Sequence, residues 1–186
     1  MKIAVYGSAS GEYPDNIEKA RELGRTIARR GHVLITGACT GLPDEAKFGA
    51  NEVGGEVLGF SPGVDLNDHI QKFGFPAQGF TELRFIPRNF PYLENKVACL
   101  NLRNVYSAAE CDAIAIIEGG IGTLGEFVNF YKTGKPIGVL EGTGGIADYV
   151  DQIVAKLKKQ TKSPIIYYGN PEQLVIRLEG LVQALA

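Results

Sequence analysis

Short apolar runs rich in β-branched residues alternate along this chain with segments whose apolar residues recur at helical spacing. Strands that are apolar along their whole length are buried on both faces, as in parallel sheets covered by helices on either side. The alternation therefore predicts a doubly wound, Rossmann-like α/β fold. The runs cover residues 2–7, 32–37, 56–61, 82–87, 112–119, 136–142 and 164–169, and most of them end at a glycine.

Length and composition narrow the class of protein. A chain of 186 residues, 45% of them hydrophobic, suits one domain, here expected over 1–186. No run reaches the roughly 18 apolar residues of a membrane helix, and no cleavable leader follows Met1, so a cytoplasmic protein without a membrane partner is expected. A net charge of −2 without a basic cluster argues against nucleic acid as a partner and favours a small molecule.

The cysteines and histidines suggest no special chemistry. Cys39, Cys99 and Cys111 are widely spaced and form no CxxC, which favours buried core positions over a disulfide or zinc site. His32 and His69 are isolated in the sequence, and we interpret them as structural or solvated. No metal and no resident cofactor are expected.

The loops that follow the strands are the expected ligand site, because doubly wound folds bind ligands at the carboxyl ends of their strands. These loops cover 7–13, 36–43, 60–79 and 118–123. The last, with the sequence EGGIGT, lies between a predicted strand and a predicted helix. Backbone N–H groups and the positive end of a helix dipole meet at such a turn, so it predicts a phosphate site.

Two other interpretations of this motif stay open. Thr123 and Glu126 match the T-x-x-E capping box, in which each side chain binds a free N–H at the helix start. Gly120, Gly122 and Gly125 match G-x-G-x-x-G, and Glu141 follows at about the distance of a ribose-binding acid, which would suit a dinucleotide-binding oxidoreductase.

The segment EGGIGTLGE, at 118–126, resembles the PGGxGTxxE motif of the LONELY GUY (LOG) family, often labelled lysine decarboxylase-like. The resemblance extends to a GSASG loop at 7–11, the helix that follows it, and a helix and strand at 100–120 that resemble the family's M-H-x-R-K region. It covers roughly residues 1–158. Members of this family are phosphoribohydrolases that release a free base from a nucleoside 5′-monophosphate.

The resemblance implies a nucleotide substrate, a homodimer with the site near its interface, and a set of site residues. Glu126 and Arg103 are the implied catalytic residues. The implied substrate-binding residues are Gly119, Gly120, Ile121, Gly122, Thr123, Asn104, Gly7, Ser8, Gly37 and Glu118.

Helical geometry gives these two catalytic positions different surroundings. Glu126 falls roughly opposite an apolar stripe, so its carboxylate is free to face a cleft or a partner subunit. Arg103 shares a polar stripe with Lys96 and Glu110, which on the pattern alone favours a solvated face. The apolar side of that helix is expected to carry Val97, Ala98, Val105 and Ala108.

Four departures from the family motif lie in the functional loops, and the expected site is less cationic than that of the family. Glu118 replaces a proline, Asn104 replaces a lysine, and Ala38 and Cys39 stand where glycines would be. Pro43 is predicted to begin a helix whose acidic first turn does not suit a second phosphate. A non-catalytic nucleotide or cofactor carrier, similar to molybdenum-cofactor carriers, therefore remains the main alternative.

Overall fold

The structure, a computed structural model, describes residues 1–11, 14–159 and 161–185. The expected ligand loop at 7–13 is therefore described only as far as Gly11, and its last two residues lie outside the described part. Strands form at all seven predicted places, and all but the first are shorter than the apolar runs. They are β1 (Lys2–Gly7), β2 (Val33–Thr36), β3 (Val57–Phe60), β4 (Glu82–Arg84), β5 (Ala113–Ile117), β6 (Ile137–Leu140) and β7 (Ile165–Tyr168).

Helices occupy most of the connections between the strands. Pro43 lies in the first turn of its helix, as predicted, because proline has no N–H to lose there. Within the described ranges, no helix has the length and apolar character needed to cross a membrane. The helices are α1 (Pro14–Arg29), α2 (Leu42–Glu52), the π-helical turn η1 (Asp68–Lys72), α3 (Lys96–Glu110), α4 (Ile121–Tyr131), the 3₁₀ helix η2 (Gly145–Tyr149), α5 (Val150–Lys156) and α6 (Pro171–Leu185).

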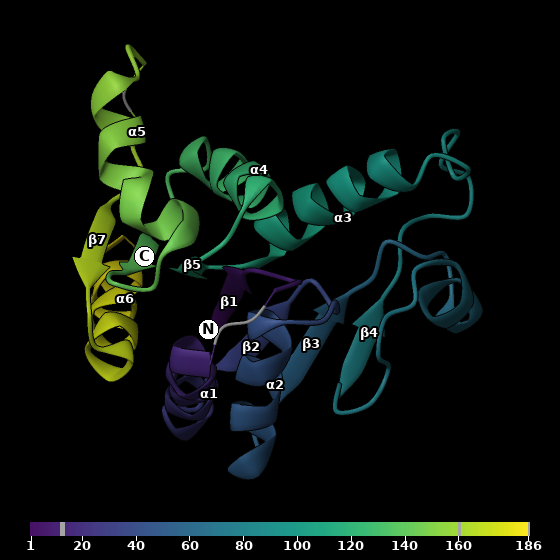
Figure 1. Cartoon of the computed structure of the whole chain (residues 1–186), viewed down its shortest axis with the longest axis horizontal. Helices are drawn as coiled ribbons and strands as arrows, with labels where there is room; N and C mark the ends of the chain where they lie inside the picture. The colour runs from purple at the N-terminus through teal and green to yellow at the C-terminus, as the bar shows by residue number, and fades with distance from the viewer. Residues whose placement is uncertain (12–13, 160, 186) are drawn as a thin grey trace.

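All strand pairs are parallel, and the sheet order is β4-β3-β2-β1-β5-β6-β7. The chain builds outward from β1 to β4 and then returns to place β5 on the other side of β1 (Figure 1). Gly7 at the end of β1 pairs with Ile117 at the end of β5, so the two following loops start level with each other. This is the topological switch point of a doubly wound sheet, where ligands bind.

Two hydrophobic cores cover the two faces of the sheet. Helices α1, α2 and α6 pack on one face, and α3, α4 and α5 pack on the other (Figure 1). Successive strand residues point to opposite faces, so Ile3 and Val5 enter the first core while Ala4 and Tyr6 enter the second. This two-sided burial confirms the predicted fold class.

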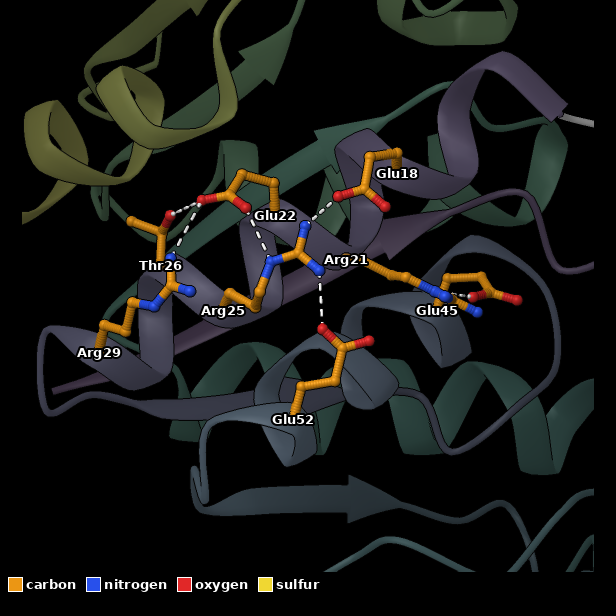
Figure 2. Close-up of polar contacts among 8 residues, drawn as sticks. All are labelled: Glu18, Arg21, Glu22, Arg25, Thr26, Arg29, Glu45 and Glu52. Carbon is orange, nitrogen blue, oxygen red and sulfur yellow. Dashed lines mark hydrogen bonds and ion pairs between the residues drawn. The ribbon is translucent and has the colours of Figure 1, made fainter.

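Helices α1 and α2 are held together by close packing and ion pairs. A Cβ added at Gly24 of α1 would lie 1.8 Å from the carbonyl oxygen of Ala46, so only glycine allows the helices to approach this closely. Beside this contact, Arg25 of α1 binds Glu52 of α2 at 2.7 Å, and Arg21 binds Glu45 at 2.8 Å (Figure 2). The pairing fixes the start of α2, which lines the site described below.

The capping-box interpretation of the glycine motif is wrong. Helix α4 begins one residue after Gly120, which is its N-cap, and no side chain caps it. Thr123 therefore lies in the first turn of the helix and not before it. Its side chain packs beside Gly119, where an added Cβ would lie 2.7 Å from the hydroxyl oxygen.

The expected orientation of α3 is also wrong. Arg103 is 5% exposed and faces inward, whereas Val97 and Val105 are 66% and 49% exposed. The inward stripe carries Cys99, Arg103, Asn104, Ser107 and Ala108. The pattern misled because the inner face of α3 covers a cavity along part of its length, so the polar residues Arg103 and Asn104 occupy positions that a core would fill with apolar ones.

Candidate active site

A cavity of about 640 Å³ opens at the carboxyl ends of β1, β2 and β5, with α3 and α4 forming part of its wall. Most of the predicted site residues line it, although they come from segments far apart in the sequence. Those lining it are Gly7, Ser8, Gly37, Arg103, Asn104, Gly120, Ile121, Gly122, Thr123 and Glu126.

Two predicted residues, Glu118 and Gly119, are absent from the cavity lining. The carboxylate of Glu118 accepts a hydrogen bond of 3.2 Å from the side chain of Asn16, and its backbone N–H donates to Thr143 at 2.9 Å. Gly119 has a positive φ of 96°, and its carbonyl oxygen accepts from the backbone of Ile146. Both residues therefore shape the turn after β5, and the Glu118 side chain is engaged by groups outside the cavity.

The first turn of α4 presents free backbone donors to the cavity. Leu124 is the first residue of α4 whose N–H bonds back to the N-cap, at 3.0 Å to the Gly120 oxygen. The N–H groups of Ile121, Gly122 and Thr123 precede it and have no carbonyl partner within the helix. A Cβ added at Gly120 or Gly122 would meet no atom within 4 Å, so these glycines leave open space beside the donors. This arrangement suits an anion.

Arg103 reaches the same cavity from α3 because Gly37 lacks a side chain. Its Nη1 donates to the carbonyl oxygen of Gly37, and a Cβ on that glycine would lie 1.7 Å from Nη1. Its Nη2 lies 4.0 Å from Oε1 of Glu126. The contact with Gly37, the residue that follows β2, thus fixes the guanidinium group near the carboxyl group on α4.

Glu126 is the acidic residue of this cavity wall and is 9% exposed. Burial raises its pKa to about 7, and the positive charge of Arg103 opposes that rise. A carboxyl group with this pKa exchanges its proton near neutral pH, which suits general acid or base catalysis. The predicted freedom of Glu126 to face a cleft agrees with this position.

Tyr6 and Phe75 also line the cavity, and the sequence motifs did not single them out. The hydroxyl of Tyr6 donates to Ser107, which donates in turn to the backbone oxygen of Asn104 at 3.1 Å. Burial raises the pKa of Tyr6 well above its usual range. Its position in the sequence could have predicted this role. Tyr6 carries the last side chain of β1, and residues at the carboxyl ends of the strands border the ligand site in this type of fold.

Phe75 depends on a buried histidine for its position. His69 is fully buried and bridges Ser61 at 2.9 Å and the carbonyl oxygen of Pro76 at 3.0 Å. Burial lowers its pKa, so the ring is neutral and its Nε2–H donates to Pro76. His69 is therefore structural, as predicted, and holds the loop that carries Phe75 against the cavity.

The dinucleotide interpretation finds little support in this geometry. The third glycine of that fingerprint normally allows close packing of helix on strand, yet a Cβ added at Gly125 would meet nothing within 4 Å. Glu141 lines a separate hollow, with Asp148 and Tyr167, and not the cavity.

The three cysteines are all buried and unpaired, as expected.

Several known proteins are similar to this chain in sequence or in fold. An uncharacterised protein of Archaeoglobus fulgidus is 29% identical over 143 residues, 76% of this chain and 80% of that protein. The X-ray structure of the protein TM1055 matches with a TM-score of 0.79 and 24% identity, covering 96% of this chain and 98% of that one. The molybdenum cofactor binding protein of Rippkaea orientalis matches with a TM-score of 0.73 and 21% identity, covering 97% and 96%.

A comparison with models of protein families supports the LOG-like relationship that the sequence motifs indicated. A family model, that of the SLOG cluster4 family, matches residues 1–175. The match spans every strand and the first turn of α6, including the whole cavity. The chain belongs to the SLOG cluster4 family.

Proposed function

We propose that the protein hydrolyses the N-glycosidic bond of a nucleoside 5′-monophosphate to give a free base and ribose 5-phosphate. One observation carries the proposal: a buried glutamate, Glu126, faces Arg103 at 4.0 Å in the same cavity where the first turn of α4 offers free N–H groups. A phosphate site beside a carboxyl group of shifted pKa is what this reaction needs.

The phosphate of the substrate would bind the N–H groups of Ile121, Gly122 and Thr123, which would hold the ribose in register. As the bond between C1′ and the base breaks with its electron pair, positive charge develops on the sugar, and the Glu126 carboxylate would stabilise it. The same carboxylate would take a proton from the attacking water as the water oxygen bonds to C1′, and this proton would pass on to the departing base, so that Glu126 is ionised again. A positioned base contributes on the order of 10² to 10⁴ in rate.

Arg103 would serve the reaction through its charge and its fixed position. The guanidinium group can bind phosphate or the departing base, and it keeps part of the Glu126 population ionised. The pKa of Glu126, about 7, leaves a substantial ionised fraction at neutral pH. Glu126 can therefore act as a base at neutral pH while it lies beside the Arg103 guanidinium group.

A non-catalytic carrier is the second candidate. The molybdenum cofactor binding protein of Rippkaea orientalis shares the fold, and Arg103 is the one cationic side chain among the described residues that line the cavity. Cys39 also lines the cavity, at a position where the LOG motif has glycine. A site with so little charge can hold a ligand without acting on it.

Incubation with a panel of nucleoside 5′-monophosphates separates the two candidates. The hydrolase proposal expects chromatography to detect a free base with the native protein and a loss of at least 100-fold with Glu126→Gln. The carrier would release no base from any nucleotide, although one of them would raise its melting temperature. Glu141→Gln, a carboxyl removal outside the cavity, is the matched control.

A cytoplasmic homodimer is part of the same proposal. Several large apolar side chains on α3 and α4 are exposed, and two of them, Val97 and Ile121, also line the cavity. A partner subunit on this face would shield them and border the site. The exposed apolar residues of the two helices are Val97, Val105, Tyr106, Ile121 and Val128.

A further inference from the structure

A second cavity, of about 630 Å³, lies between α4, α5 and the segment that follows α5, on the sheet face that these helices cover (Figure 1). Among the described residues, this α4–α5 groove shares no lining residue with the cavity that holds Glu126. Phe127 is 1% exposed and forms its floor, whereas Val128 is 43% exposed and lies at its edge. The groove is therefore recessed but open. Its apolar lining consists of Leu124, Phe127, Val128, Tyr131, Ile153 and Leu157.

The uncharged polar side chains of the groove are engaged by the protein itself. The hydroxyl of Tyr131 donates to the carbonyl oxygen of Lys159 at 3.0 Å. The hydroxyl of Thr133 donates to the backbone oxygen of Phe130 at 2.8 Å, and that of Thr161 donates to the backbone oxygen of Tyr131. The groove thus offers a ligand mainly hydrocarbon contact, which suits an apolar chain better than a sugar or a nucleotide.

Three lysines, Lys132, Lys159 and Lys162, give the groove a positive rim. All three are exposed, and within the described ranges their ammonium groups form no ion pair and no hydrogen bond. The described lining also contains no acidic residue, although the chain as a whole carries a net charge of −2. Positive charge beside an apolar recess is complementary to a molecule with a hydrocarbon body and one anionic end.

We propose that the α4–α5 groove binds a single-chain fatty acid, with the hydrocarbon chain along the apolar lining and the carboxylate beside the lysines. The volume lies within the range of small-molecule sites, roughly 300–1,000 Å³. A helix of a partner protein would need a contact area well beyond one groove of this size. A flat membrane surface cannot reach the recessed Phe127, whereas a free chain can enter. This binding goes beyond the proposed hydrolysis and does not depend on it.

Calorimetric titration of the native protein tests both parts of the ligand. The probes are octanoate, decanoate and dodecanoate, together with decanol and decyltrimethylammonium, all below their micelle concentrations. Each step of two CH₂ groups should tighten binding about ten-fold, because each added CH₂ leaves water for the apolar lining. Decanol and decyltrimethylammonium should each bind at least five-fold more weakly than decanoate, because neither carries a negative charge.

Two pairs of lysine variants test the rim. Lys132→Gln together with Lys162→Gln should weaken decanoate binding roughly 3- to 10-fold and leave decanol binding within about twofold. The difference should shrink in about 0.5 M salt, which screens exposed charges. Lys156→Gln together with Lys158→Gln is the matched control, because these lysines are equally exposed and lie outside the lining. The control pair should leave both affinities within about twofold.

A second copy of this chain is the competing occupant, because Val128 also belongs to the exposed apolar face of α3 and α4. Absence of decanoate binding overturns the inference, whether the protein sediments as a dimer that covers the groove or as a monomer. Equal affinity for decanoate, decanol and the cation, or binding to anionic vesicles alone, overturns it as well. None of these results bears on the release of a base from a nucleotide, so the proposed function is tested separately.

Discussion

Glu126 combines a position in the cavity wall with an electrostatic cost to the folded state. Its pKa in the folded protein, about 7, lies above the ordinary value of a glutamate, because burial disfavours the ionised form. The resulting stabilisation is fully present below the unfolded pKa, near 4.5, and is lost as pH rises through about 7. The folded protein therefore becomes less stable across this window.

Glu126→Gln should remove that loss, because glutamine stays uncharged at every pH. Between pH 4.5 and 8 the variant should gain about 3 kcal/mol of unfolding free energy relative to the native protein. Melting temperatures measured at several pH values should then diverge by roughly 5–10 °C. The exposed Glu141→Gln variant should show no such trend, and a constant difference for Glu126→Gln would contradict the assigned pKa.

Gly37 acts through Arg103 in this account. A methyl group at Gly37 would displace the guanidinium group from its contact with the Gly37 carbonyl oxygen, so Gly37→Ala should lower kcat/KM by roughly 10- to 100-fold. The double variant with Arg103→Ala should be no slower than Arg103→Ala alone, since both changes remove the same contact. Additive losses in this double-mutant cycle would show that Gly37 has a separate role.

The start of α4 is the element that defines the site, and its glycines can be tested apart from folding. Gly122→Ala places a methyl group in open space and suits a helix better than glycine, so the unfolding free energy should stay the same or rise by up to about 1 kcal/mol. Phosphate-ester affinity, measured by titration, should nonetheless fall at least ten-fold. Gly180→Ala, at an exposed position of α6, is the matched control and should not alter binding.

Whether the sequence predicted an element and its orientation correctly depended on what each face of that element packs against. The strands other than the edge strand β4 were predictable because both of their faces meet apolar cores, which makes whole runs apolar. Helix α3 was not, because part of its inner face meets a cavity and its outer face carries exposed Val97 and Val105. Periodicity alone cannot distinguish a polar stripe that faces a ligand from one that faces water.

The candidate site was predictable where a short motif carries it and not where tertiary folding assembles it. The glycine loop and Glu126 belong to one contiguous segment, so the motif located them together. Phe75 lies on a loop that the hydrogen bonds of His69 hold against the cavity, and no local sequence pattern predicts this position. The side chain of Glu118, in contrast, is taken by Asn16 on α1, a partner 102 residues away.

At the scale of the whole molecule, the exposed apolar side chains on α3 and α4 predict self-association. Analytical ultracentrifugation should find a dimer, and Val105→Glu together with Val128→Glu should dissociate it without lowering the melting temperature of the monomer fold. Ile176→Glu, an equally apolar exposed residue on α6, is the control and should leave the dimer intact. A native protein that is monomeric at micromolar concentration would contradict this prediction.

The most direct test of the central claim quantifies both products of the reaction together. Hydrolysis at the glycosidic bond predicts that the native protein releases free base and ribose 5-phosphate in equal amounts from a nucleoside 5′-monophosphate, and that Glu126→Gln releases neither at a comparable rate. Mass spectrometry in ¹⁸O-labelled water should place the heavy oxygen on C1 of the ribose. Release of inorganic phosphate and an intact nucleoside, or equal product formation by both proteins, would contradict the account.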